Sequence, residues 1–248
     1  MRYFYLFASL LLALPCYAQG NLRVVYQALM RPTQESVTPG ESKRILQIDG
    51  SQSLFYQPTK VHKPFKDRPA VKTEYPNMIK KNYPNEGELT FKDEVGFVLF
   101  YYVEPIPEFD WEMLDGDSTV CDYPCKKAQT TFRGRSWKVW YTEEIPYSDG
   151  PWKLCGLPGL ILKATDAKGD YAFTAFKITH DAPDKEIKFS TSGYKKTTPE
   201  QFAKDKTECM KDSYQWRGVT PPKVYIDGKP MVRPSYTANL LEIFPEKK

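Results

Sequence analysis

The chain has 248 residues, and its 35 basic and 31 acidic side chains leave a formal net charge of +4. Mixed charges in this proportion are typical of a solvated surface and argue against a nucleic-acid partner. Aromatic residues make up 15% of the chain and there are 21 prolines, a composition that favours short strands and turns over long helices.

The first 18 residues have the layout of a secretory signal peptide. A basic residue precedes an apolar run over residues 3–14, and small residues precede an expected cleavage site at Gln19. The run is shorter than the ~20 residues of a membrane-spanning helix. We therefore expect an exported protein, periplasmic or associated with the outer membrane, with a single domain over residues 19–248. A retained anchor and a lipoprotein attached at Cys16 are the alternatives.

The N-terminal half carries strand patterns. Residues 21–31 predict a first strand, and residues 44–56 predict a hairpin. Residues 59–86 are rich in lysine and proline, contain His62, and predict a surface excursion. Residues 87–103 resume the strand pattern. Because the run 95–103 is strongly apolar, we expect a central strand that is covered on both faces.

The C-terminal half continues this pattern. Residues 109–114 predict a short strand, and residues 126–142 and 160–178 predict two hairpins. A helix is expected over residues 198–214, because a threonine, a proline and a glutamine at its start supply capping groups. Residues 221–248 are expected to form a poorly ordered tail.

Together these elements predict a mainly β fold. We expect a curved antiparallel sheet or half-barrel, with one late α-helix over its concave side.

Four cysteines follow the predicted cleavage site, and in an oxidising compartment an even number predicts two disulfides. Three pairings are possible, and the sequence leaves them open. A zinc site with four thiolates is the rival interpretation. Zinc ligands usually come in closely spaced pairs, but the last two of these cysteines are far apart in the sequence. We therefore expect no metal. The disulfide candidates are Cys121, Cys125, Cys155 and Cys209.

Residues 150–161 form a motif rich in glycine and proline. Glycine tolerates positive φ and proline fixes φ, so these residues predict a rigid bend between two strands. The structural residues of the bend are Gly150, Pro151, Gly156, Gly159, Leu160 and Ile161. A second interpretation is a recognition surface, whose candidate binding residues are Trp140, Tyr141, Trp152, Leu157 and Pro158.

The motif also carries a resemblance. Residues 156–161 read GLPGLI and follow CKKA at 125–128, FRGR at 132–135 and GPW at 150–152. This ordered set resembles the GLPGLI family, exported proteins of Bacteroidetes-type bacteria. The resemblance implies export and a shared fold. The family has no known function, so the resemblance implies no catalytic residue, cofactor or partner.

The familiar catalytic motifs are missing from the sequence. Its two histidines, His62 and His180, belong to no HExxH pattern, and no G-x-S-x-G elbow occurs. We therefore expect no cofactor and a non-catalytic binding or carrier protein that uses an aromatic sheet face. Its partner would be a lipid, a peptide or an outer-membrane protein. The alternative is a periplasmic hydrolase whose carboxylates are assembled by the fold, from among Asp110, Glu143, Glu144 and Asp149.

Overall fold

The computed structural model describes residues 21–58, 77–180 and 189–220, and near the C-terminus residues 223, 225–226, 229–231 and 235–244. The predicted signal peptide and His62 lie outside these residues. Within the described part of the chain, twelve strands form one sheet. A separate short hairpin consists of β13 (Tyr225–Ile226) and β14 (Lys229–Pro230).

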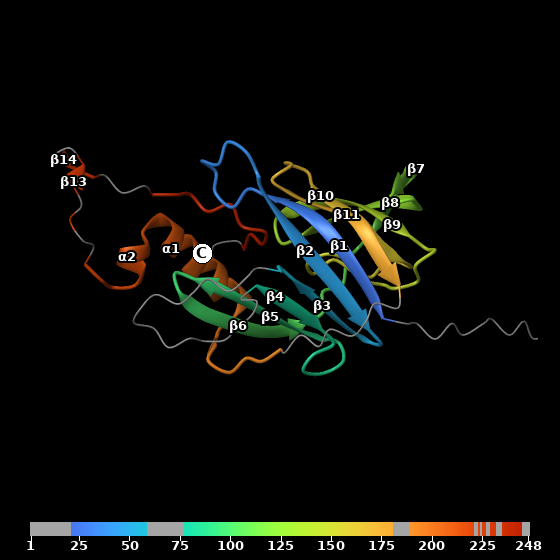
Figure 1. The fold of residues 1–248 in the computed structure, drawn as a ribbon, viewed down its shortest axis with the longest axis horizontal. Coiled ribbons are helices and arrows are strands. Elements are labelled where there is room, and N and C mark those ends of the chain that lie inside the picture. The colour runs from blue at the N-terminus through green and yellow to red at the C-terminus, as the bar shows by residue number, and fades with distance from the viewer. Residues whose placement is uncertain are drawn as a thin grey trace, which may run out of the picture.

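The large sheet consists of two antiparallel meanders (Figure 1). The first comprises β1 (Leu22–Met30), β2 (Gly40–Asp49), β3 (Gln52–Tyr56), β4 (Met78–Lys81), β5 (Glu88–Val95) and β6 (Val98–Pro105). The second comprises β7 (Glu112–Val120), β8 (Tyr123–Phe132), β9 (Arg135–Thr142), β10 (Leu160–Asp166) and β11 (Tyr171–His180). The pairing of β1 with β11 joins the meanders in the middle of the sheet. A short strand, β12 (Lys195–Lys196), lies parallel to β6, so the sheet ends at β12 and β7 and stays open.

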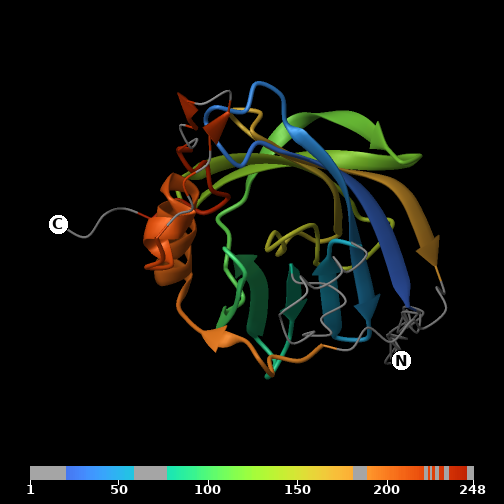
Figure 2. The same ribbon diagram turned by 60° about the vertical axis from the view of Figure 1, so that its left-hand side comes forward.

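The sheet curls around an interior that holds the main core (Figure 2). Side chains alternate between the two faces of a strand. In β1, accordingly, Leu22, Val24, Tyr26 and Ala28 are buried, and the residues between them are more exposed. A smaller cluster of four buried residues lies apart from the main core and consists of Ile45, Leu54, Tyr56 and Met78. The predicted fold class, a curved and mainly antiparallel sheet with a late helix, is confirmed.

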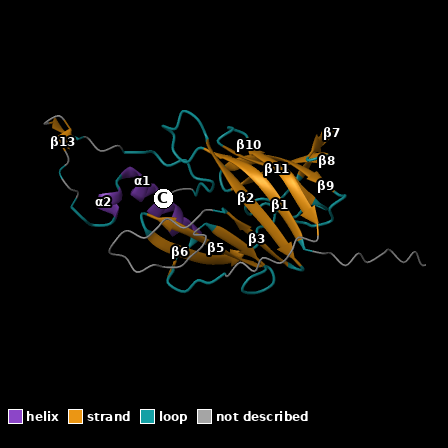
Figure 3. Cartoon of the chain, in the orientation of Figure 1, coloured by secondary structure: helices purple, strands orange, loops and turns teal. Residues whose placement is uncertain are grey.

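The helical part lies beside β5 and β6 (Figure 3). Helix α1 (Pro199–Lys211) begins as predicted, because the hydroxyl of Thr198 accepts a hydrogen bond from Gln201 N at 3.2 Å. It ends at Asp212, which caps the short helix α2 (Ser213–Trp216). Phe202 is the buried residue of α1, and its ring packs edge-on against Phe91 at 5.2 Å. No helix in the described residues is long and apolar enough to cross a membrane.

The expectation of one central strand over residues 95–103 is wrong. Gly96 and Phe97 both have positive φ, 52° and 76°, and they form a tight turn between β5 and β6. Residues other than glycine rarely adopt a positive φ, so a phenylalanine at this position does not indicate a turn in the sequence. The apolar run therefore consists of the end of β5, the turn and most of β6, which lies next to the edge strand β12.

The prediction of two disulfides is also wrong, because all four described cysteines are free thiols. Cys121 lies in the turn between β7 and β8, and Cys125 points into the core from β8. Cys155 lies in the connection between β9 and β10, whereas Cys209 lies on α1. No pair of these four cysteines lies at the distance that a disulfide requires.

Candidate functional site

The connection between β9 and β10, residues 143–159, turns into the curve of the sheet (Figure 2). We call it the inner loop. It is held at its base, because Leu160 N donates to Ile145 O at 3.0 Å and Ile161 N donates to Asp149 O at 2.9 Å. Its middle residues Trp152, Lys153 and Leu154 are buried. The inner loop therefore fills part of the space that the sheet encloses.

Two glycines allow this tight course. A Cβ on Gly159 would lie 2.0 Å from Thr142 O, and a Cβ on Gly150 would lie 2.7 Å from the Cβ of Ile161. Real Cβ atoms do not approach other atoms so closely, so larger residues would push the loop away from the strands. Glycine at these two positions therefore allows the close course of the inner loop along β9 and β10.

A group of buried charges lies where the inner loop meets the sheet. The Lys153 ammonium contacts the carboxylates of Glu104 and Glu242, and the Arg133 guanidinium contacts the same two carboxylates. Lys153 also donates to the Tyr102 hydroxyl at 3.0 Å. We call these five residues the interior ion cluster. Its two cations and two anions alternate, so each buried charge has partners of opposite sign.

Burial and charge change the acidity of the cluster. Burial raises the pKa of Tyr102 well above its ordinary value, and the nearby carboxylates Glu242 and Glu104 raise it further. For Arg133, burial alone lowers the pKa, but the bonds to Glu104 and Glu242 outweigh burial and raise it. The tyrosine therefore stays neutral and the guanidinium stays charged across the physiological range.

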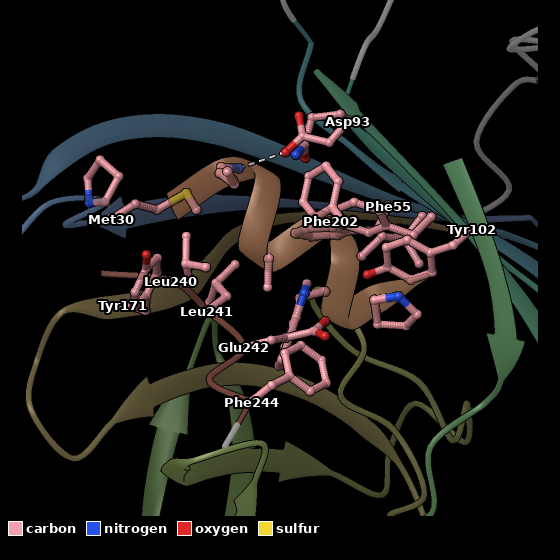
Figure 4. Close-up of a pocket in the computed structure, with 18 of the residues that line it drawn as sticks. Met30, Phe55, Asp93, Tyr102, Tyr171, Phe202, Leu240, Leu241, Glu242 and Phe244 are labelled. Atoms are coloured by element: carbon pink, nitrogen blue, oxygen red, sulfur yellow. Dashed lines mark hydrogen bonds and ion pairs between the residues drawn. The ribbon is translucent and has the colours of Figure 1, made fainter. Parts of the chain in front are cut away.

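An apolar cavity of about 110 Å³ lies beside the cluster (Figure 4). Three elements enclose it, namely the concave face of the sheet, helix α1 and the C-terminal segment. Its apolar lining includes Phe55, Ile79, Phe91, Phe173, Phe202, Leu240, Leu241 and Phe244. Its charged lining consists of Arg44, Asp93, Lys206 and Glu242. Lys206 and Asp93 form an ion pair, in which Lys206 Nζ donates to Asp93 Oδ2 at 2.9 Å.

The C-terminal segment, residues 235–244, covers this cavity. Asn239 anchors it by accepting from Arg135 Nη2 at 2.5 Å and donating to Arg31 O at 2.9 Å. The Arg135 Nε group donates to Leu240 O at 2.7 Å. Although the sequence predicts a poorly ordered tail, these residues make specific contacts with the sheet.

A second, polar cavity of about 140 Å³ is lined in part by residues 147–149 and Cys155 of the inner loop. The Lys81 ammonium pairs there with Asp149 and also donates to Leu154 O at 3.2 Å. Ser53 lies opposite Lys81 in the sheet register, and its buried hydroxyl has no hydrogen-bond partner in the structure. Cys155 also lines this cavity, and burial raises the pKa of its thiol. Lys81 thus fixes the base of the inner loop.

Comparison with known proteins bears on this region. The family model described as "Protein of unknown function (Porph_ging)" matches residues 133–163, which include the inner loop. No curated protein matches the chain. The structure of PNGF-II in space group P21 has a TM-score of 0.51 and 16% identity, covering 75% of this chain and 32% of that chain. The structure of PNGF-II in space group C2 has a TM-score of 0.50 and 15% identity, and the match covers 74% of this chain and 32% of that chain. This chain spans about a third of the PNGF-II chains, and the similarity shows the fold alone.

The five candidate binding residues do not form one surface. Trp140 lies on the outer face of β9, where Lys163 Nζ stands 4.6 Å from its ring centre. Tyr141 and Leu157 are buried, and Pro158 is exposed. Trp152 is the member that lines the apolar cavity, and its ring packs 5.6 Å from Trp137.

The four candidate carboxylates also lie apart. Asp110, Glu143 and Glu144 are exposed, and Glu143 pairs with Lys126 at 2.8 Å. Asp149 lines the polar cavity. Among the described residues, moreover, no group of three or more histidines, cysteines or acids is arranged to hold a metal ion.

Except for Trp152, the residues that line the apolar cavity, and all five residues of the interior ion cluster, were not among the sequence-predicted site residues. Glu104, Arg133, Lys153 and Glu242 are far apart in the chain, and no local spacing connects them. A weak signal was available in Lys153, a charged residue between Trp152 and Leu154 in an otherwise apolar bend. Such a lysine is buried only if a partner neutralises it.

Proposed function

We propose that this chain is an exported binding protein of the cell envelope, and that it holds an apolar part of its ligand in the apolar cavity. Ligand sites are concave, mostly apolar, and carry a few placed polar groups. The cavity beside Phe202 has this composition, and the interior ion cluster supplies polar groups at its wall.

The cavity itself is the observation that carries the proposal. Protein interiors are close-packed, and voids larger than a water molecule are few. An engineered apolar cavity of about 150 Å³ stays dry and binds benzene. The cavity of about 110 Å³ in this protein is of similar size, so it can accept an aliphatic segment or a small ring.

A neutral fluorescent probe, N-phenyl-1-naphthylamine, tests this proposal. We expect saturable binding at one site and displacement by 1-dodecanol. Ala203 lines the cavity from α1, so Ala203→Trp should fill it and weaken probe binding about tenfold or more. Lys204→Trp is the matched control, because Lys204 is exposed on the same helix. Equal binding by both variants, or no saturable binding, would contradict the proposal.

We also propose that the chain is exported and is a member of the GLPGLI family. The N-terminal signal pattern supports export, and the hexapeptide at residues 156–161 lies within the stretch matched by a family of unknown function. Expression in a Gram-negative host should give a periplasmic product that begins at Gln19. A product that stays in the cytoplasm and retains its first 18 residues would contradict export.

A further inference from the structure

We propose that the ligand is a fatty acid, and that its carboxylate binds Arg133 and Lys153 in the place that Glu242 takes in this structure. The inference rests on the proposed function and adds the chemical class of the ligand. It follows from the way the C-terminal segment completes the interior ion cluster.

The two cations belong to the body of the fold, whereas one of the two anions does not. Arg133 lies in the turn between β8 and β9, and Lys153 lies in the inner loop. Glu104 belongs to β6 and contacts both cations. Glu242 reaches the cluster from the C-terminal segment.

Charge balance shows what the site requires when Glu242 leaves. Arg133, which is half-buried, and Lys153, which is fully buried, would then share the single carboxylate of Glu104. A buried ammonium that loses a carboxylate partner is strongly unfavourable. The nearby carboxylate of Asp93 is already paired with Lys206. A ligand that displaces the segment therefore has to bring one negative charge.

The neighbours of Glu242 indicate what must be attached to that charge. Leu240, Leu241 and Phe244 line the apolar cavity together with Glu242 (Figure 4). The segment thus presents a carboxylate next to apolar groups, and its departure would enlarge the apolar space beside the two cations. A carboxylate on an aliphatic chain matches both features. Arginine and lysine bind carboxylates through charge-assisted hydrogen bonds.

The exchange requires only residues 240–244 to move. Residues 235–239 stay attached, because hydrogen bonds join them to residues 31–35 and to Tyr171. Apart from the interior ion cluster, residues 240–244 are held by Arg135 Nε donating to Leu240 O at 2.7 Å, by Ile243 N donating to Arg133 O at 2.9 Å, and by the Arg133 guanidinium 5.0 Å from the Phe244 ring centre. Arg135 keeps its own buried partner Asp166 at 2.6 Å when residues 240–244 leave. The sheet therefore does not depend on the segment for its internal pairing.

Titration calorimetry with dodecanoate and 1-dodecanol tests the inference, because the two probes differ in the headgroup. Glu242→Gln removes the competing carboxylate, and we expect it to bind dodecanoate about tenfold more tightly than the wild type. Its affinity for 1-dodecanol should change less than about twofold. The double variant Glu242→Gln with Lys153→Met removes one charge of each sign. It should bind dodecanoate no more tightly than the wild type does.

The outcomes separate this inference from the proposed function. If 1-dodecanol binds but Glu242→Gln gives no selective gain for dodecanoate, the fatty-acid inference is wrong and the apolar cavity remains a binding site. If neither probe binds any folded variant, both proposals are wrong.

Hydrogen exchange on the wild type gives a test without substitutions. Dodecanoate should deprotect residues 240–244 and 1-dodecanol should not, and equal protection with both probes would contradict displacement of these residues.

Discussion

Gly159 shows how one residue determines the course of a whole loop. Its Cα lies so close to the backbone of Thr142 that a single added carbon has no room. The residue links the end of β9 to the start of β10, so the inner loop leaves and returns at the same point. The motif at residues 150–161 therefore acts through backbone shape, which can be predicted from glycine and proline alone.

Gly159→Ala should destabilise the protein by at least about 3 kcal/mol, because the new Cβ would overlap Thr142 O. Gly169→Ala is the matched control. Gly169 has a positive φ of 70°, which Gly159 does not, but nothing lies within 4 Å of its position for a Cβ. The control should cost only about 1 kcal/mol. Urea unfolding of both variants measures the difference, and equal losses would show that the inner loop tolerates a shift.

Lys92 gives a prediction on pH. It is buried in β5, and burial lowers the pKa of its ammonium to about 8. Between pH 8 and the ordinary lysine pKa of about 10.4, the unfolded chain binds the proton that the folded protein has lost, so stability rises with pH. The free energy of unfolding of the wild type minus that of Lys92→Met should rise by about 2 kcal/mol from pH 8 to pH 10. Urea unfolding at each pH measures this difference, and a flat difference would show that Lys92 titrates normally.

At the scale of elements, helix α1 is attached to the sheet largely through one aromatic residue. Phe202 contacts Phe91, Phe100 and Tyr102, and the rest of the helix is partly or fully exposed. The helix also forms one wall of the apolar cavity. A weakly attached element of this kind opens locally more easily than the sheet does.

Phe202→Ala should therefore loosen α1 without unfolding the sheet. We expect hydrogen-exchange protection to fall about tenfold or more in residues 202–211, with no change in β1. Lys204→Ala is the control, because the side chain of Lys204 is 66% exposed. A loss of protection spread over all strands would mean that the helix is part of the cooperative core.

The elements differ in how far the sequence predicts them. The helix start and the hairpins β2–β3, β8–β9 and β10–β11 follow from local capping and alternation, and the structure has all of them. The β5–β6 turn was missed because Phe97 occupies a position that favours glycine. The two cavities were missed for another reason. Their walls come from strands that are far apart in the chain, and the sequence does not show which strand faces lie opposite each other in the fold.

For the molecule as a whole, the C-terminal segment is the part that connects the apolar cavity with the interior ion cluster. It covers the apolar cavity and completes the interior ion cluster, although it adds no strand to the large sheet. Ion pairs between residues as distant as Arg133 and Glu242 leave no pattern in the sequence. The sequence therefore predicts the sheet better than it predicts the site.

Asn239→Ala should release the segment, since Asn239 bonds both to Arg135 and to Arg31 O. We expect chymotrypsin to cleave after Leu240 and Leu241 about tenfold faster, while the rest of the chain stays resistant. Tyr236→Ala is the control, because Tyr236 is 44% exposed. Mass spectrometry of the fragments reads out the cleavage sites, and unchanged cleavage would show that Asn239 does not hold the segment.

The central position of β1 has a consequence for biosynthesis. Its Leu22 pairs with His180 of β11, so the first strand to emerge during synthesis completes one of its two ladders only after more than 150 further residues have been made. Until then β1 keeps an unpaired edge, which can associate with other nascent chains. The first meander therefore has to stay apart from other chains until the second one has been made.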